Sequence, residues 1–172
     1  MSQYKIFETE RLILKPTSEK DAEFIFELMN TPKWIKYIGD RNIKTVEMAR
    51  TYIKTKMLPQ FKKLGYGNYT LVRKSDNHKI GTCGLFDRKG LEGIDIGFAF
   101  LPQYEKKGYA SESANKLKDV AFNKFGLTSL NAITVKDNIS SQKLLEKLGL
   151  KLVGTTKLPD DNEELLLYEI KA

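Results

Sequence analysis

Cysteine and histidine are almost absent from this 172-residue chain, and their scarcity excludes several kinds of site. Cys83 is the single cysteine, so an intrachain disulfide is impossible, and with the single His78 it cannot build a four-ligand structural zinc site. We therefore expect no metal and a cytoplasmic protein with a reduced thiol. Cys83 is expected to be a small apolar strand residue, and His78 a solvated turn residue.

Long apolar runs are also missing. None approaches the roughly 20 residues of a membrane helix, and no apolar stretch follows a basic start as in a secretory signal. The chain instead has 41% apolar and 30% charged residues, which suits a single globular domain over residues 1–172 with no membrane contact. Its net charge of +7 favours anionic partners, without choosing among nucleic acid, lipid headgroups and a phosphorylated cofactor.

Hydrophobic periodicity separates helical from extended segments. Helical spacing occurs in residues 19–30, 45–63, 110–125 and 139–148, with a short helical or irregular turn at 31–39. A period near two predicts seven strands, at residues 11–17, 68–74, 78–86, 93–101, 130–137, 150–157 and 163–172. This order predicts a mixed α/β domain with an antiparallel front half.

Residues 101–113, LPQYEKKGYASES, join a predicted strand to a predicted helix. A helix N-terminus exposes unpaired N–H groups and a partial positive charge. Gly108 removes bulk there, Lys106 and Lys107 add charge, and Ala110 and Ser111 are small. The stretch therefore predicts a phosphate site. Taken alone it equally fits a solvated basic loop, because neither GxxxxGK[ST] nor GxGxxG is present.

Three segments resemble one known family. EKKGYA, between IDIGFAFLP and a helix, resembles the acetyl-CoA loop [RQ]-x-x-G-x-[GA] of the GNAT N-acetyltransferases, and more narrowly the Y-W-G-K-G-Y-A of their RimJ/RimL-like branch. ETERLILKP is similar to the branch's T-x-R-L-x-L-R-x, and VKDNISSQKLLEKLGLKLVG is similar to V-x-x-x-N-x-x-S/A…E-K-x-G-F. The matches follow family order from residue 8 to about 154, and we take 8–172 as the motif-bearing region.

The resemblance implies a fold and a cofactor. The fold is a six- to seven-stranded, mostly antiparallel mixed sheet with about four helices, in which the fourth strand (Ile94 to Leu101) splays from the fifth (Leu130 to Lys136). Acetyl-CoA would be the acetyl donor. Its pantetheine arm would pair with the backbone of Phe98, Ala99, Phe100 and Leu101, and its pyrophosphate would lie on the amides of Lys106, Lys107, Gly108, Tyr109, Ala110 and Ser111. Tyr109 would lie either over the cofactor or beneath it.

Two residues of the loop depart from the family pattern. Glu105 occupies the Arg/Gln position, and because a carboxylate repels a pyrophosphate we expect its side chain to face solvent. Lys106 replaces the first glycine of W-G-K-G-Y-A, where it either swings out to a phosphate or restricts the loop. The backbone amides are unaffected by either change.

Acetyl transfer requires a neutral amine, an oxyanion donor and a proton for the leaving thiolate. Asp95 takes the position of Glu in the family's E-I-G-Y, on the strand face of Gly97 and Ala99. It is a candidate base that accepts the amine proton through water; the alternative is a structural Asp hydrogen-bonded at the strand start. A backbone N–H near Phe98 or Ala99 is the expected oxyanion donor.

A second candidate pair follows the fifth strand. Asn138 and Ser141 lie three residues apart and share a helix face. The resemblance implies that Asn138 contacts the pantetheine region. It also implies that Ser141 contacts the cofactor and protonates the thiolate, because the tyrosine that many GNAT enzymes have seven residues after the Asn is Leu145 here. The alternative is that Ser141 only satisfies first-turn amides.

These features predict an N-acetyltransferase that moves an acetyl group directly to a primary amine, either a protein N-terminal α-amine or a small-molecule amine. Trp34, Ile35, Tyr37 and Ile38 either wall the acceptor site or form a core patch. The alternative function is a non-catalytic acyl-CoA-binding or sensing domain on the same fold. We expect no nucleic-acid partner, because only the charge suggests one, and a monomer or a homodimer.

Overall fold

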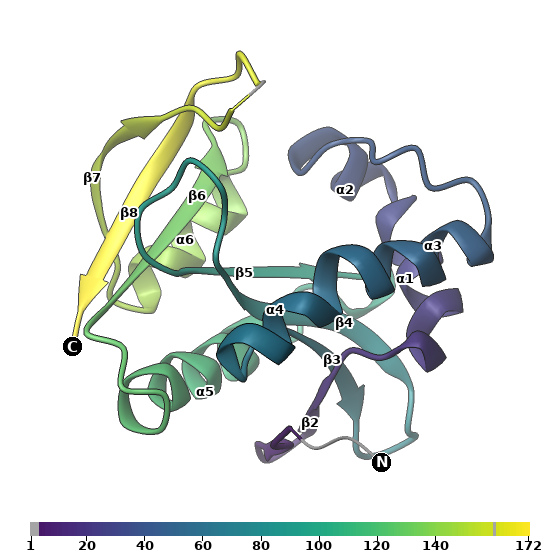
Figure 1. The fold of residues 1–172 in the computed structure, drawn as a ribbon. Helices are drawn as coiled ribbons and strands as arrows, with labels where there is room; N and C mark the ends of the chain where they lie inside the picture. Colours follow the sequence, from purple (N-terminus) through teal and green to yellow (C-terminus); the bar gives the residue numbers. More distant parts are fainter. Residues whose placement is uncertain (1–3, 160) are drawn as a thin grey trace.

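A single eight-stranded sheet organises the computed structural model, which describes residues 4–159 and 161–172 (Figure 1). The strand order is β1-β2-β3-β4-β5-β6-β8-β7, and every pair is antiparallel except β5–β6. The strands are β1 (Phe7–Glu8), β2 (Leu12–Pro16), β3 (Asn68–Arg73), β4 (Lys79–Phe86), β5 (Asp95–Phe100), β6 (Ser129–Val135), β7 (Lys151–Thr156) and β8 (Leu165–Lys171). The seven predicted strands are confirmed. The eighth, β1, has two residues and is too short to show a period.

Helices cover both faces of this sheet. They are α1 (Ala22–Met29), α2 (Pro32–Tyr37), α3 (Val46–Tyr52), α4 (Leu58–Leu64), α5 (Tyr109–Asn123) and α6 (Ile139–Lys147), with 3₁₀ turns η1 (Glu19–Asp21) and η3 (Pro102–Tyr104). Helix α5 packs on β2, β4 and β5, and its apolar side chains join the larger core cluster. Helices α1 and α3 form a second cluster with Leu101, against which Ala99 packs. The expectation of about four helices is too low, since α2 is a true helix and the helix at 45–63 is divided.

A five-residue π turn, η2 (Ile53–Met57), divides that predicted helix into α3 and α4. The N–H of Leu58 bonds the carbonyl of Ile53, five residues back. Pro59 explains the change of period, because it has no N–H for the carbonyl of Thr55 and its ring crowds that carbonyl. Turns of this kind occur frequently at functional sites.

Strands β5 and β6 separate almost as soon as they meet, which confirms the predicted splay. Their parallel ladder has one pair, Asp95 with Asn131, whereas β4 pairs with β5 from Asp95 to Phe100. In Figure 1, β5 crosses the molecule while β6 and β8 rise steeply away from it. The sheet is therefore open along the second half of β5.

Candidate active site

The open edge of β5 presents peptide groups from every second residue. The N–H of Leu101 donates to Ile80 of β4 (3.0 Å), and the N–H of Asn131 donates to the carbonyl of Ile94 (2.9 Å). The backbone groups of successive strand residues alternate between the two neighbours, so Phe98 and Phe100 direct their N–H and C=O toward β6. They lie beyond the single β5–β6 pair. Of the four residues predicted to pair with pantetheine, these two offer backbone groups to the gap, whereas Ala99 and Leu101 bond β4.

The loop between η3 and α5 has two left-handed residues. Gly108 is the N-cap of α5 with φ 84°, and Lys106 has φ 60°. Only glycine takes this conformation without steric cost, so Lys106 adopts a backbone shape that glycine would favour while carrying a side chain. A Cβ added at Gly108 would lie 3.2 Å from Nη2 of Arg11. Gly108 thus serves both the turn and the close approach of Arg11.

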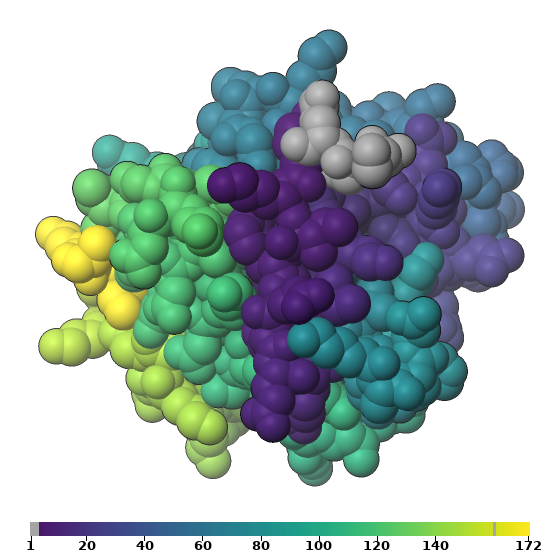
Figure 2. All heavy atoms as spheres, turned by 90° about the horizontal axis from the view of Figure 1, so that it is seen from below, coloured from purple at the N-terminus to yellow at the C-terminus, as the bar shows by residue number. Residues whose placement is uncertain are grey.

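The turn between β1 and β2 clamps this loop from outside. Nη1 of Arg11 donates to the carbonyl of Lys107 (3.0 Å), and Nε donates to Oε1 of Glu112 in the first turn of α5 (2.7 Å). Oε2 of Glu112 accepts from the backbone N–H of Arg11 (3.0 Å) and from the hydroxyl of Thr9. Figure 2 shows the N-terminal hairpin lying against the residues of α5 on this face.

The contacts of Thr9 and Arg11 with Lys107 and Glu112, which we call the clamp, set the direction of the Gly108 amide. In a trans peptide the carbonyl of Lys107 and the N–H of Gly108 point in opposite directions. Because the carbonyl faces Arg11, the N–H of Gly108 faces away from the hairpin. Burial opposes ionisation of Glu112, but the hydrogen bonds from Thr9 and Arg11 outweigh it and lower the pKa of Glu112.

Stacked aromatic and guanidinium groups support the loop from beneath. The Arg11 guanidinium lies 4.2 Å from the ring centroid of Tyr109, and that of Arg73 lies 4.9 Å from Tyr104. Tyr109 is buried in the larger core cluster, so it packs beneath the loop. His78 lies in an exposed turn as predicted, although its Nδ1 also contacts the hydroxyl of Tyr104 (3.2 Å).

Glu105 does not face solvent as expected. Its side chain is 23% exposed and forms an ion pair with Lys33 of α2. The ammonium group neutralises the carboxylate that would repel a pyrophosphate. Sequence reasoning missed Lys33 because its partner is 72 residues away and no motif joins them.

Asp95 is buried at the start of β5. It is 1% exposed, and both its carboxylate oxygens accept from Nε of Arg88 (2.9 and 3.0 Å). Burial raises the pKa of Asp95, and Arg88 opposes the shift. A Cβ at Gly97 would lie 3.9 Å from Nη2 of Arg88, so Asp95 and Gly97 share a face as predicted. Sequence reasoning missed Arg88, because it is an isolated arginine in a predicted turn and no motif links it to Asp95.

Helix α6 begins beside the end of β6, with Asn138 as its N-cap. Oδ1 of Asn138 accepts from the N–H of Ser141 (3.2 Å), which leaves the Asn138 amide NH₂ without a partner among the described residues. Ser141 is half-buried, and its hydroxyl makes no hydrogen bond within residues 4–159 and 161–172. Leu145 is 1% exposed and packs in the core. Of this group, only Asn138 and Ser141 can act as polar groups.

The aromatic and apolar residues of α2 divide between core and surface. Trp34 is half-buried against the cluster that includes Ala99, whereas Ile35 and Ile38 are each 41% exposed. Among residues 4–159 and 161–172, no group of three or more His, Cys, Asp or Glu side chains is arranged to hold a metal. No helix in the same residues is long and apolar enough to span a bilayer.

Comparison with known proteins identifies the family of the chain. Residues 11–151 match the family described as acetyltransferase (GNAT) domain. The uncharacterised N-acetyltransferase YoaA of Bacillus subtilis is 30% identical over 155 residues, covering 90% of this chain and 87% of the relative. A GNAT-family acetyltransferase from Bacillus anthracis superposes with a TM-score of 0.78 at 25% identity, covering 97% of this chain and 98% of that one. A ribosomal L7/L12 α-N-protein acetyltransferase in complex with coenzyme A shares the fold, with a TM-score of 0.82 at 16% identity over 97% and 98% of the two chains.

Proposed function

The chain belongs to the GNAT acetyltransferase family, and we propose that it transfers acetyl from acetyl-CoA directly to a primary amine, either a protein N-terminal α-amine or a small-molecule amine. One observation carries the proposal: the open edge of β5 lies between a loop whose Gly108 amide faces away from the N-terminal hairpin and the capped start of α6. The chain as a whole, residues 1–172, would be one such domain. We place it in the cytoplasm, where its buried Cys83 stays a thiol.

Acetyl-CoA would supply an activated acetyl thioester, and its two ends need different groups. The pyrophosphate would lie on the amides of residues 106–111, with Arg11 and Glu112 fixing their direction. The pantetheine arm would lie along β5 and use the free peptide groups of Phe98 and Phe100. A structural neighbour is in complex with coenzyme A, which supports the choice of cofactor.

Three groups divide the chemistry in this proposal. The N–H of Phe98 faces the gap and stabilises the charge that develops on the carbonyl oxygen, a role that Ala99 cannot fill because its N–H bonds β4. Asp95 accepts the amine proton through a water, since it is too buried for direct contact, and Arg88 holds it in place. Ser141, whose hydroxyl has no partner among the described residues, donates a proton to the departing thiolate.

Calorimetry with acetyl-CoA, followed by thiol release with a panel of amines, tests the proposal. No binding by high-micromolar acetyl-CoA would overturn it. Asp95→Asn should lower kcat by about 10²–10⁴-fold and change the pH profile, and Ser141→Ala should lower kcat with little change in cofactor affinity. The exposed neighbour Ser140, changed to alanine, is the matched control. Tight binding with no turnover on any amine would indicate the alternative, an acyl-CoA-binding domain.

A further inference from the structure

The positive charge of the molecule is concentrated in one segment. Residues 31–64 contain nine Lys and Arg but only two Asp and Glu, a formal charge of +7 that equals the net charge of the whole chain. The remaining 138 residues contain 20 basic and 20 acidic side chains. The segment comprises α2, α3, the π turn and α4, and we name it the basic layer.

Apart from Lys33, which pairs with Glu105, the basic side chains of this layer form no ion pair with the loop of residues 101–113 among the described residues. Residues 101–113 contain two lysines and two glutamates, so the loop has no net charge. Its two glutamates, Glu105 and Glu112, are bound by Lys33 and Arg11. The basic layer must therefore have another partner if its charge is used in binding.

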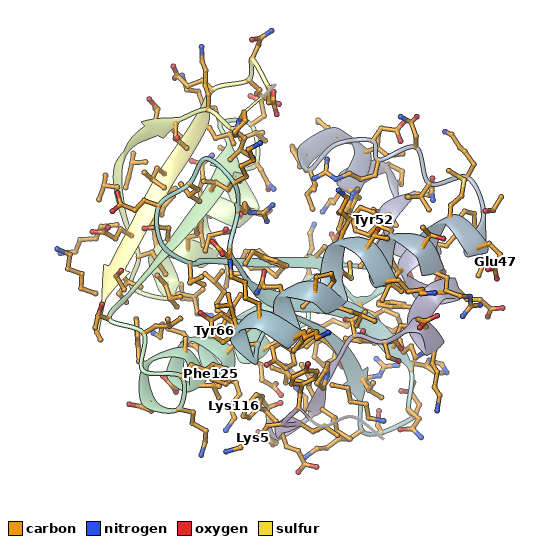
Figure 3. The ribbon with its side chains drawn as sticks, in the orientation of Figure 1. Lys5, Glu47, Tyr52, Tyr66, Lys116 and Phe125 are labelled. Carbon is orange, nitrogen blue, oxygen red and sulfur yellow. The ribbon has the colours of Figure 1, made fainter. Side chains whose placement is uncertain are left out.

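The basic layer presents free cations beside exposed apolar side chains. Seven of its basic side chains are exposed and form no ion pair with any described residue: Lys36, Arg41, Lys44, Lys54, Lys56, Lys62 and Lys63. Ile35, Ile38 and Met48 are each 41% exposed. A shallow cavity of about 380 Å³ lies over α3 and the π turn, lined in part by Ile43, Met48, Tyr52 and Lys56. Figure 3 shows Tyr52 and Glu47 on helix α3, which borders it.

The layer adjoins the face of β5 where the amine would react. Tyr52 and Trp34 pack in the same cluster as Ala99, two positions from Gly97 and four from Asp95. Lys33 of α2 reaches the cofactor loop. A chain that places its amine at the β5 gap can therefore extend over α2 and α3 without leaving the protein surface.

We propose that the basic layer binds an acidic polypeptide whose own amine is the acceptor, an inference that rests on the proposed transferase function. Acidic side chains complement the free lysines, and an apolar side chain fits the cavity. A polypeptide also supplies an aliphatic amine, which nucleic acid lacks. Nearby positive charge lowers the pKa of an ammonium group, so it increases the neutral fraction of the acceptor amine.

Peptide acetylation at two salt concentrations tests this inference. Peptides with the same free first residue would carry either glutamates or glutamines at positions three to six. The layer variant is Lys44→Glu/Lys54→Glu/Lys56→Glu. The matched control is Lys15→Glu/Lys124→Glu/Lys171→Glu, three exposed lysines outside the layer and outside every ion pair between described residues.

The expected result is a preference for the acidic peptide of about tenfold in kcat/KM at low salt, reduced at high salt. The layer variant should lose that preference but should still acetylate a small uncharged-side-chain amine at the wild-type rate. The control variant should keep the wild-type preference for the acidic peptide. Equal turnover of both peptides, or equal effects of the two variants, would overturn the inference and leave the transferase intact. Failure to bind acetyl-CoA would instead overturn the proposed function. Binding of RNA or phosphatidylserine vesicles that is lost in the layer variant, with the peptide preference unchanged, would also overturn the inference.

Discussion

The loop of residues 101–113, which we propose binds the cofactor, and the basic layer both border β5, yet they are built in opposite ways. The loop has no net charge, and its backbone is fixed by Arg11, Glu112 and a left-handed glycine. The layer is strongly charged, is interrupted by a π turn, and keeps lysines and apolar side chains in solvent. A backbone site suits a ligand that never changes, whereas a side-chain surface can be altered without disturbing the fold. We therefore expect substitutions in the loop to affect every acceptor alike, and those in the layer to discriminate among acceptors.

The largest effect is expected at Gly108. Changing it to valine forces a β-branched residue to φ 84° and places Cβ 3.2 Å from Arg11. Strain of ~1–3 kcal/mol would turn the loop amides and weaken acetyl-CoA binding by about 10- to 100-fold for every acceptor. Gly126→Val is the matched control, because Gly126 is also left-handed (φ 71°) but has no neighbour within 4 Å. If both variants bind acetyl-CoA equally well by calorimetry, the loop does not bind the pyrophosphate.

A tenfold effect is expected when the clamp is removed. Arg11→Met keeps the apolar cover on Tyr109 but removes the side-chain hydrogen bonds to Lys107 and Glu112. We expect the Kd of acetyl-CoA to rise about tenfold while kcat at saturation changes little, since Arg11 acts on the loop and not on the reacting atoms. Arg41→Met in the basic layer should leave the Kd unchanged and alter only peptide preference. A fall in kcat with an unchanged Kd for Arg11→Met would contradict a positioning role.

Sequence patterns predicted the elements that depend on neighbouring residues, but not the contacts between residues far apart in the chain. The seven longer strands follow from periodicity and residue type, and the splay between β5 and β6 follows from the family resemblance. The partners of Glu105 and Asp95 did not follow, because Lys33 and Arg88 lie in segments without a motif and meet them only in the folded chain. The π turn was also missed, since one proline in an otherwise periodic helix gives no sign of how the chain will adapt.

The clamp should also weaken in acid. Hydrogen bonds from Thr9 and Arg11 outweigh burial and lower the pKa of Glu112, so its ionisation stabilises the fold above the ordinary glutamate pKa of about 4.3. That stability is lost as pH falls from there through the folded pKa. Because Arg11 is 41% exposed, we expect a contribution of only ~1 kcal/mol.

Urea unfolding of the wild type and of Glu112→Gln from pH 7 to pH 3 measures this contribution. The two should differ near neutrality and converge below pH ~4. Glu164→Gln, which removes an exposed ion pair with Lys136, should give a smaller difference. A difference for Glu112→Gln that is constant across the range would show that its charge is not what holds the clamp.

The one ion pair that joins the two regions offers a finer test. Lys33→Gln leaves Glu105 unneutralised beside the proposed pyrophosphate site, and we expect the Kd of acetyl-CoA to rise about threefold at low salt. Glu105→Gln in the same background should restore the affinity, because the repulsive charge is then gone. If the double variant binds as weakly as Lys33→Gln alone, Lys33 contacts the cofactor itself and not through Glu105.

The smallest expected effect is at Lys106, where the loop departs from the family glycine. A left-handed lysine costs ~1–2 kcal/mol, and glycine loses ~0.5–1 kcal/mol through the entropy of the unfolded chain. Lys106→Gly should therefore raise the free energy of unfolding by up to ~1 kcal/mol, whereas Lys107→Gly, at a position that is not left-handed, should lower it. Acetyl-CoA affinity should change little in Lys106→Gly, since the amides keep their directions. A large loss of affinity would show that the Lys106 ammonium binds phosphate. The loop would then bind its ligand through a charged side chain, as the basic layer is proposed to do, and the contrast between the two regions would no longer hold.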